Sequence, residues 1–213
     1  MQTSDLCMYG DKIPGKKQAV YDAVCAFIEE GRDTSALTVS EITKRAGIGK
    51  GTAYEYFDSK EEMVNGAVCS RIVGLQRQAI SEMKARSCLH DCLEVLCDLF
   101  DNNSFDLLMY HAIKGKSGRL DDPDEIRETM RRFTIAKTAY DREITQILAR
   151  AAADEIGQPA DGDEDYVNIA LTMVIHLIRE ACFSHKMTGE WSDFDRGKML
   201  DECMKILKKL LLH

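Results

Sequence analysis

Apolar residues recur along most of this chain at spacings of three and four positions, which is the period of an amphipathic α-helix. In the N-terminal part this period predicts a helix over residues 16–30, a second from residue 38 to about 46, and a third over 50–57. Thr38 and Glu41 have the spacing of a capping box, which marks the start of the second helix. Residues 47–49 include two glycines, which allow the positive φ of a sharp reversal. The pattern therefore predicts a helix-turn-helix.

The rest of the chain keeps the helical period. A long fourth helix is expected from about residue 59, and five further helical segments follow it: residues 89–101, 105–114, 122–156, 163–186 and 193–212. The segment 163–186 is apolar almost all round, so it must be covered on more than one side. We therefore expect an all-α protein, with a three-helix N-terminal domain and a larger helical C-terminal domain.

The composition supports a globular helical protein. Of 213 residues, 45% are hydrophobic and only 3 are proline, so the chain can fill a core with few helix breaks. Residues 1–12 are expected to form a mobile tail. The sequence has neither the apolar centre of a signal peptide nor a run of ~18 apolar residues, so we expect a cytoplasmic protein with no membrane span. Its eight cysteines are then expected to be reduced thiols.

The net charge of −8 argues against a partner that demands a basic protein, but the charge is unevenly distributed. Residues 1–60 hold 8 basic and 9 acidic residues, a net charge of −1, whereas residues 61–213 hold 20 and 27, a net charge of −7. From Thr38 to Lys60 the balance is +1. The charge therefore indicates weak non-specific DNA affinity, so that recognition depends on a few well-placed contacts.

The third predicted helix has side chains suited to DNA. A recognition helix enters the major groove with its N-terminus first, so its first turn faces base edges and phosphates. Lys50 supplies a cation, Gly51 leaves room for the backbone, and Thr52 offers a hydroxyl and a methyl. Tyr54, Tyr56, Ser40 and Lys60 have polar groups that can donate to nearby phosphate oxygens. The complete candidate set is therefore Ser40, Lys50, Gly51, Thr52, Tyr54, Tyr56 and Lys60. The alternative for Tyr54 and Tyr56 is that one of the two rings packs inward instead of contacting DNA.

Residues 37–60 closely resemble the DNA-binding signature of the TetR family of bacterial transcriptional regulators. Beyond this part the resemblance is one of helix number and order. It implies that the seven candidate residues contact DNA, that residues 13–60 are the DNA-binding domain, and that residues 61–213 are a helical regulatory and dimerisation domain. In such a protein the last two helices pair with their copies as a four-helix bundle.

Three residues bear on how closely the chain follows this pattern. Thr43 replaces the usual alanine, which is tolerable but shifts helix packing slightly. Ala53 replaces the usual leucine, so Ile48 and Phe57 are expected to fill the lost volume. Glu55 lies near the groove, where it is either a solvated charge or an acceptor for a cytosine amino group.

The resemblance predicts a homodimeric, ligand-responsive regulator, most commonly a repressor that a small molecule releases from a pseudo-palindromic operator in double-stranded DNA. The candidate pocket residues are large and mostly apolar: Phe100, Met109, Tyr110, Met130, Phe133, Tyr140, Met173 and His176. Each of these residues can alternatively be an ordinary core residue, and His176 can alternatively belong to a polar stripe that faces solvent or an interface.

Other functions have weaker support. Cys88, His90 and Cys92 suggest a metal or thiol-redox site, but a structural zinc site usually needs four well-spaced ligands, so we expect no metal and no cofactor. The run around Lys50 departs from a phosphate-binding loop because Gly51 intervenes before the hydroxyl residue. A thiol-redox-responsive regulator and a dimeric adaptor that no longer binds DNA remain alternatives. No catalytic set can be nominated, so an enzyme is not expected.

Overall fold

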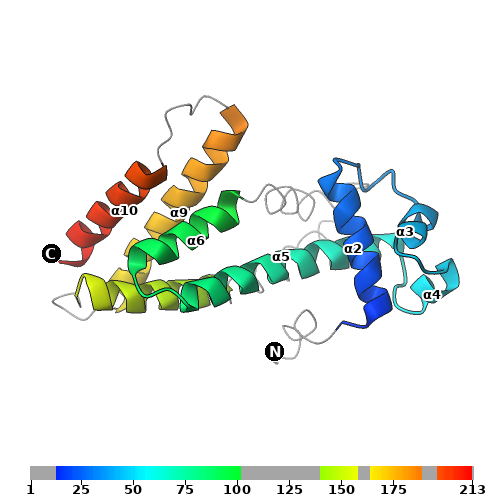
Figure 1. Ribbon diagram of the computed structural model, residues 1–213, viewed down its shortest axis with the longest axis horizontal. Coiled ribbons are helices and arrows are strands. Elements are labelled where there is room, and N and C mark those ends of the chain that lie inside the picture. The colour runs from blue at the N-terminus through cyan, green and yellow to red at the C-terminus, as the bar shows by residue number, and fades with distance from the viewer. Residues whose placement is uncertain (1–12, 102–139, 158–163, 189–195, 213) are drawn as a thin grey trace. The chain divides into compact units, whose positions relative to one another are not determined.

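A computed structural model describes residues 13–101, 140–157, 164–188 and 196–212 (Figure 1). Within these ranges all regular secondary structure is α-helical and no strand occurs. The described residues up to Leu75 form one compact unit, and those from Gln76 onward form another. The predicted all-α fold, with an N-terminal helix-turn-helix and a larger C-terminal helical part, is confirmed. The predicted tail, residues 1–12, lies outside the described residues.

The first unit consists of α2 (Gly15–Glu29), α3 (Val39–Arg45), α4 (Lys50–Tyr54) and the first part of α5 (Lys60–Lys84) (Figure 1). The apolar period along α2 and α5 puts their side chains on a common core with α3 and the segment after α4. The largest fully buried members of this core are Ile28, Leu37, Ile42, Phe57 and Met63.

The start of α3 confirms the predicted capping box. The backbone N–H of Glu41 donates to Thr38 Oγ1 at 3.2 Å, and the backbone N–H of Thr38 donates to Glu41 Oε2 at 2.9 Å. Arg32 also donates to Glu41, so the pKa of this carboxyl falls to about 2, mainly because of Arg32 and then because of Thr38. Two of the helix's first N–H groups therefore have partners, which fixes where α3 begins.

The two departures from the family pattern are accommodated inside this core. Thr43 is buried, and its hydroxyl donates to the Val39 carbonyl oxygen at 2.8 Å, so the extra polar group is satisfied by its own helix. Ala53 is fully buried, and Phe57, whose backbone N–H donates to the Ala53 carbonyl oxygen at 3.1 Å, is buried in the same core. Ile48 is only half-buried. Tyr21 of α2 instead contributes the second ring, with its centroid 5.6 Å from that of Phe57.

Tyr21 also lies directly against α5. A Cβ placed on Gly66 would be only 2.5 Å from the Tyr21 hydroxyl oxygen, so the ring occupies space that any larger residue would fill. The tyrosine is itself 5% exposed. Gly66 thus permits α5 to approach α2 closely, and this contact connects α5 to the residues that follow α4.

The second unit contains the end of α5, α6 (Leu89–Asp101), a helix over residues 140–155, α9 (Glu164–Thr188) and α10 (Arg196–Leu211). Helix α6 packs against α9, and α10 packs against both. Leucines dominate the buried side chains where these helices meet, among them Leu93, Leu96, Leu148, Leu171 and Leu207. No described helix is both long enough and apolar enough to cross a membrane.

The helix bounds differ from the prediction in few places. The predicted recognition helix 50–57 is observed as α4 over Lys50–Tyr54, followed by a turn whose N–H groups at residues 56 and 57 still bond to Ala53. The predicted segment 105–114 lies outside the described residues, and the predicted helix 122–156 is described only from residue 140.

Candidate functional site

The reversal between α3 and α4 sets the position of the candidate recognition helix. Gly47 has a φ of +68°, a conformation that side chains disfavour. The N–H of Ile48 donates to the Thr43 carbonyl at 3.0 Å and closes the end of α3. Helix α4 then begins at once after Gly49. This turn presents the first residues of α4 at the surface.

The predicted DNA-contacting residues lie close together in sequence and mostly at the surface. Lys50 and Gly51 are exposed in the first turn of α4, and Thr52 is half-buried. Tyr54 is 53% exposed, whereas Tyr56 is half-buried, so Tyr56 is the less exposed of the two rings. Contact of these residues with DNA stays a prediction.

Ser40 and Lys60 flank α4 on either side in the sequence. Ser40 is exposed in the first turn of α3. The ammonium group of Lys60 donates to the Ser35 carbonyl oxygen at 2.9 Å and therefore holds the loop before α3 against the start of α5. Lys60 thus has a structural role that the sequence did not reveal.

Two arginines of the first unit are engaged in ion pairs. Arg45 binds both carboxylate oxygens of Glu30, at 2.7 and 2.8 Å, and stacks over the ring of Phe27. The hydrogen bond with Arg45 lowers the pKa of Glu30 and raises that of Arg45. Arg32 pairs with Glu41 at 2.9 Å and lies over the same ring. These guanidinium groups hold α2 to α3, so they are poorly placed to neutralise phosphates.

Lys44 and Lys50 are the exposed cations of α3 and α4 that no described acidic group pairs with. Sequence reasoning selected Lys50 but missed Lys44. The sequence signal was present, because Lys44 lies in the last turn of α3 next to the turn. Glu55 is exposed, which agrees with a solvated charge.

Four of the eight candidate pocket residues belong to the part of the chain that the structure describes. Met109, Tyr110, Met130 and Phe133 lie outside the described residues. Phe100 is half-buried near the end of α6 and Tyr140 is half-buried, whereas Met173 is 54% exposed and His176 is also exposed. Of these described candidates, Tyr140 lines a hollow.

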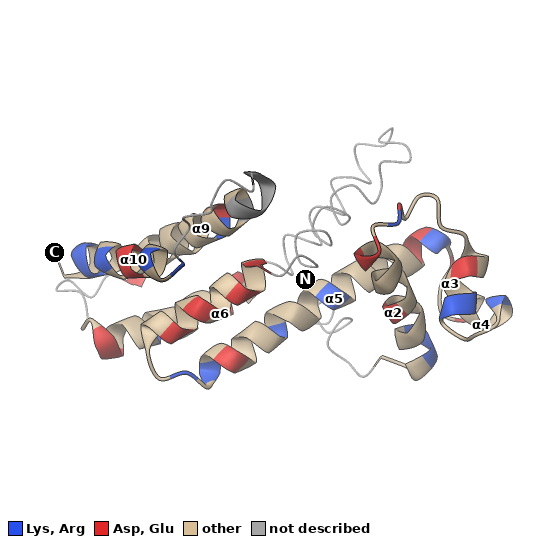
Figure 2. Cartoon of the chain, turned by 45° about the horizontal axis from the view of Figure 1, so that its top comes forward, with Lys and Arg blue, Asp and Glu red and all other residues tan. Residues whose placement is uncertain are grey.

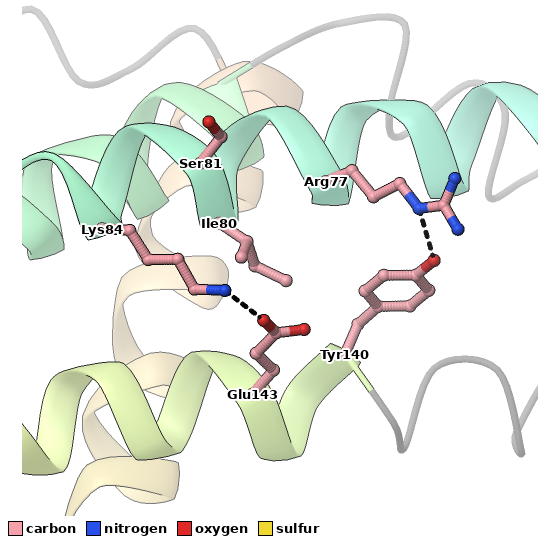
Figure 3. Close-up of a pocket in the computed structure, with 6 residues that line it drawn as sticks. All are labelled: Arg77, Ile80, Ser81, Lys84, Tyr140 and Glu143. Atoms are coloured by element: carbon pink, nitrogen blue, oxygen red, sulfur yellow. Dashed lines mark hydrogen bonds and ion pairs between the residues drawn. The ribbon is translucent and has the colours of Figure 1, made fainter. Parts of the chain in front are cut away.

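That hollow, of about 420 Å³, lies between the last part of α5 and the helix over residues 140–155 (Figure 3). Arg77 Nε donates to the Tyr140 hydroxyl at 3.2 Å, and Lys84 Nζ pairs with Glu143 at 2.6 Å. Two cations, a carboxylate, a phenol and two smaller side chains thus line it: Arg77, Ile80, Ser81, Lys84, Tyr140 and Glu143. The sequence analysis selected only Tyr140, because the cations belong to a helix whose polar positions look like ordinary surface.

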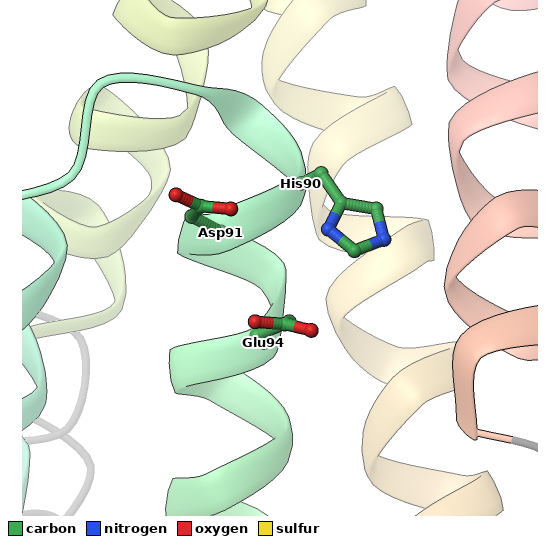
Figure 4. Close-up of side chains that lie close together, drawn as sticks. All are labelled: His90, Asp91 and Glu94. Carbon is green, nitrogen blue, oxygen red and sulfur yellow. The ribbon is translucent and has the colours of Figure 1, made fainter.

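A second group of polar side chains lies on α6. His90, Asp91 and Glu94 have ligand atoms within 4.8 Å of one another (Figure 4). Cys92 points elsewhere, since it is buried and donates to the Met83 carbonyl oxygen. All three residues belong to one stretch of α6, in which His90 and Asp91 are half-buried and Glu94 is exposed, and the described residues add no fourth ligand. They form part of the acidic surface of α6, whose carboxylates appear as red bands in Figure 2.

A short reversal, a surface-directed helix and supporting ion pairs define the first unit as a helix-turn-helix domain. Residues 26–67 match the family described as bacterial regulatory proteins, tetR family. The N-terminal part of this chain thus matches the helix-turn-helix of the tetR family, and the resemblance found in the sequence is confirmed.

The chain is also similar to individual regulators. Over 72 residues it is 35% identical to the HTH-type transcriptional regulator BetI of Rhizobium meliloti (strain 1021), a match that covers 34% of this chain and 35% of BetI. The alignment thus spans about a third of that relative's length.

Two solved structures share the fold along nearly the whole chain. The fatty acid degradation regulator FadR from Bacillus halodurans has a TM-score of 0.59 at 17% identity, covering 94% of this chain and 97% of FadR. FadR from Bacillus subtilis in complex with stearoyl-CoA has a TM-score of 0.55 at 20% identity, covering 91% and 97%. At these identities the likeness concerns the fold.

Proposed function

We propose that this chain is a homodimeric, DNA-binding transcriptional repressor that a small molecule releases from a pseudo-palindromic operator. The observation that carries the proposal is the TetR-family helix-turn-helix with the first turn of α4 at the surface. Residues 13–60 would read DNA and residues 61–213 would bind the effector and the second copy. A regulator of this kind acts in the cytoplasm and needs no catalytic residues.

For DNA recognition, we assign base and groove contacts to Lys50, Gly51, Thr52 and Tyr54. A cation, a hydroxyl and a phenol at the start of a helix suit base edges and phosphate oxygens. Ser40, Tyr56 and Lys60 are assigned to flanking phosphates, with Lys44 added because of its exposure. The ammonium group of Lys60 donates one hydrogen bond to the Ser35 carbonyl oxygen, so it would bind a phosphate through another of its N–H groups.

For dimerisation, we assign the exposed apolar side of α9. Tyr166, Ile169, Met173 and Leu177 are each more than 40% exposed and recur at spacings of three and four, so they fall on one side of the helix. Leu171, Val174 and Ile178 are fully buried on the other side. A contiguous apolar stripe of this size is typical of a surface that a second chain covers. Ile206 of α10 and Leu212, directly after α10, extend the exposed apolar set.

The homodimer would place two recognition helices on one operator. Two-fold symmetry puts half-sites about 34–36 Å apart, or somewhat more, on successive major grooves. With the stripe covered, Met173 and His176 belong to the contact between copies rather than to an effector pocket.

For the effector, we assign the hollow lined by Arg77, Lys84, Tyr140 and Glu143. Its cations suit a ligand with an anionic or polar group, and Phe100, Met109, Tyr110, Met130 and Phe133 stay candidates for an apolar part. An amphipathic molecule agrees with the stearoyl-CoA bound by the structurally similar FadR from Bacillus subtilis. Helix α5 lines the hollow and also carries Gly66 beside Tyr21, so a ligand that shifts α5 would alter operator affinity by a population shift.

The test is selection of duplexes from a random DNA pool by the full chain, followed by footprinting. We expect enrichment of a sequence with two related half-sites, protected on one face of the duplex. Variants Lys50→Gln and Thr52→Ala should lose that enrichment, whereas Lys205→Gln, which removes an exposed cation of α10, should keep it. Enrichment of no sequence would favour the adaptor alternative. Equal enrichment by all variants would contradict DNA recognition by the first turn of α4.

A further inference from the structure

Three cysteines meet where α6, α9 and α10 pack together. Cys97 of α6, Cys182 of α9 and Cys203 of α10 are 0%, 1% and 4% exposed. The thiols of Cys97 and Cys182 are hydrogen-bonded to each other. The sequence directed attention to Cys88 and Cys92, which share a turn, whereas this pair is joined only by the packing of α6 on α9.

Arg196 links the thiol pair to the surface. Its guanidinium donates to Asp98 Oδ1 at 2.8 Å and to the Glu94 carbonyl oxygen at 2.6 Å, and it also interacts with Cys97. The Arg196 side chain is 35% exposed, so the guanidinium extends from solvent to a thiol that has no exposure of its own. A small polar molecule that entered along this side chain would reach Cys97 first.

The same contacts make the two thiols chemically unequal. The pKa of Cys97 lies below its ordinary value, mainly because Cys182 donates a hydrogen bond to it and also because of the positive charge of Arg196. The pKa of Cys182 is raised, mainly by the same hydrogen bond and then by burial. A thiolate attacks oxidants and a thiol does not, so Cys97 is the nucleophile of the pair and Cys182 its partner.

We propose that Cys97 and Cys182 form an oxidative modification site, at which a hydroperoxide closes an intramolecular disulfide between α6 and α9. Cys97 Sγ bonds to one peroxide oxygen as the O–O bond breaks, and the departing oxygen leaves as an alcohol, or as water from hydrogen peroxide. Cys182 Sγ then attacks the Cys97 sulfenic sulfur, the S–O bond breaks, and its oxygen leaves as water. Both thiol protons end in the released hydroxyl groups. The thiols lose two electrons and the peroxide gains them.

The disulfide would act on a helix with a second role. Helix α9 carries the exposed apolar stripe on the side away from its buried residues, so a covalent link to α6 fixes the position of that stripe. An effect on operator binding rests on the proposed function, whereas formation of the disulfide does not.

The experiment treats the full chain with hydrogen peroxide under native conditions, blocks remaining thiols with N-ethylmaleimide after unfolding, and maps peptides without reduction. We expect two of the eight thiols to be lost per chain, with the Cys97 and Cys182 peptides linked, and dithiothreitol to restore both. Variants Cys97→Ser and Cys182→Ser should form no such link, whereas Cys92→Ser, the matched buried cysteine of α6, should behave as wild type.

Several results would overturn the proposal. These are eight blockable thiols after treatment, a link between other cysteines or between chains, and equal thiol loss in Cys97→Ser. If a serine variant fails to fold, Arg196→Gln retains both thiols and should slow disulfide formation several-fold, and an unchanged rate would contradict the route past Arg196. Reduced protein that binds no DNA but still forms the link refutes the proposed function alone. Oxidised protein that binds as reduced protein does refutes the regulatory effect.

Discussion

Replacing Gly66 by alanine tests the contact that joins α5 to the helix-turn-helix. The added Cβ would lie 2.5 Å from the Tyr21 hydroxyl oxygen and 2.9 Å from two ring carbons. The ring cannot simply swing aside, because it is buried and pairs with Phe57. Overpacking of this kind costs about 1–3 kcal/mol, against which alanine gains about 1 kcal/mol of helix propensity. We expect a net loss of about 1 kcal/mol in the free energy of unfolding.

Gly74 provides the matched control on the same helix, because a Cβ there meets no atom within 4 Å. Gly74→Ala should therefore show only the propensity gain of about 1 kcal/mol. Urea unfolding followed by circular dichroism measures both, and the two variants should differ by about 2 kcal/mol. Removing the hydroxyl in Tyr21→Phe should recover part of the Gly66→Ala loss. If Gly66→Ala were as stable as Gly74→Ala, the close approach of α5 to Tyr21 would be refuted.

Two further predictions concern charge and association. The pKa of Glu41 is about 2 in the folded chain against an ordinary value of 4.5, so its stabilisation is complete above about pH 4.5 and is lost as the pH falls toward 2. The free energy of unfolding, measured in urea, should thus fall more steeply as the pH drops over this range in wild type than in Glu41→Gln. If the free energies of the two proteins fell in parallel, the pairing with Arg32 would be contradicted. Met173→Glu should convert the dimer to a monomer in sedimentation experiments because it puts a charge in the apolar stripe of α9, whereas the exposed substitution Glu180→Gln should not; a dimer that persists in Met173→Glu would exclude this stripe.

The helices and the turn could be predicted from the sequence because their signals are local. The capping residues Thr38 and Glu41 are three positions apart, and the glycine at residue 47 adopts the positive φ expected of it. The bounds of α6 agree with the predicted range of 89–101, because its apolar pattern is local and ends at two asparagines, residues 102 and 103.

The side-chain partners depend on tertiary packing, which the sequence does not reveal. Tyr21 packs against the ring of Phe57, and periodicity gave no reason to choose it over other apolar residues of α2. Likewise, the net charge of residues 38–60 does not reveal that Arg45 pairs with Glu30, fifteen positions earlier. Half of the candidate pocket residues fall outside the described part of the chain. The described hollow is lined by Tyr140 together with residues that the sequence did not single out, among them Arg77 and Lys84.

The salt dependence of operator affinity tests DNA recognition most directly. Each phosphate contact by a cation contributes a slope of about −0.9 in log Kobs against log salt, so Lys44, Lys50 and Lys60 in two copies give about −5.4. Lys50→Gln should reduce this slope to about −3.6, while Lys205→Gln should leave it unchanged, as measured by titration of the selected duplex at several salt concentrations. Affinity that does not vary with salt, or a slope that Lys50→Gln leaves unaltered, would contradict operator recognition by the first turn of α4.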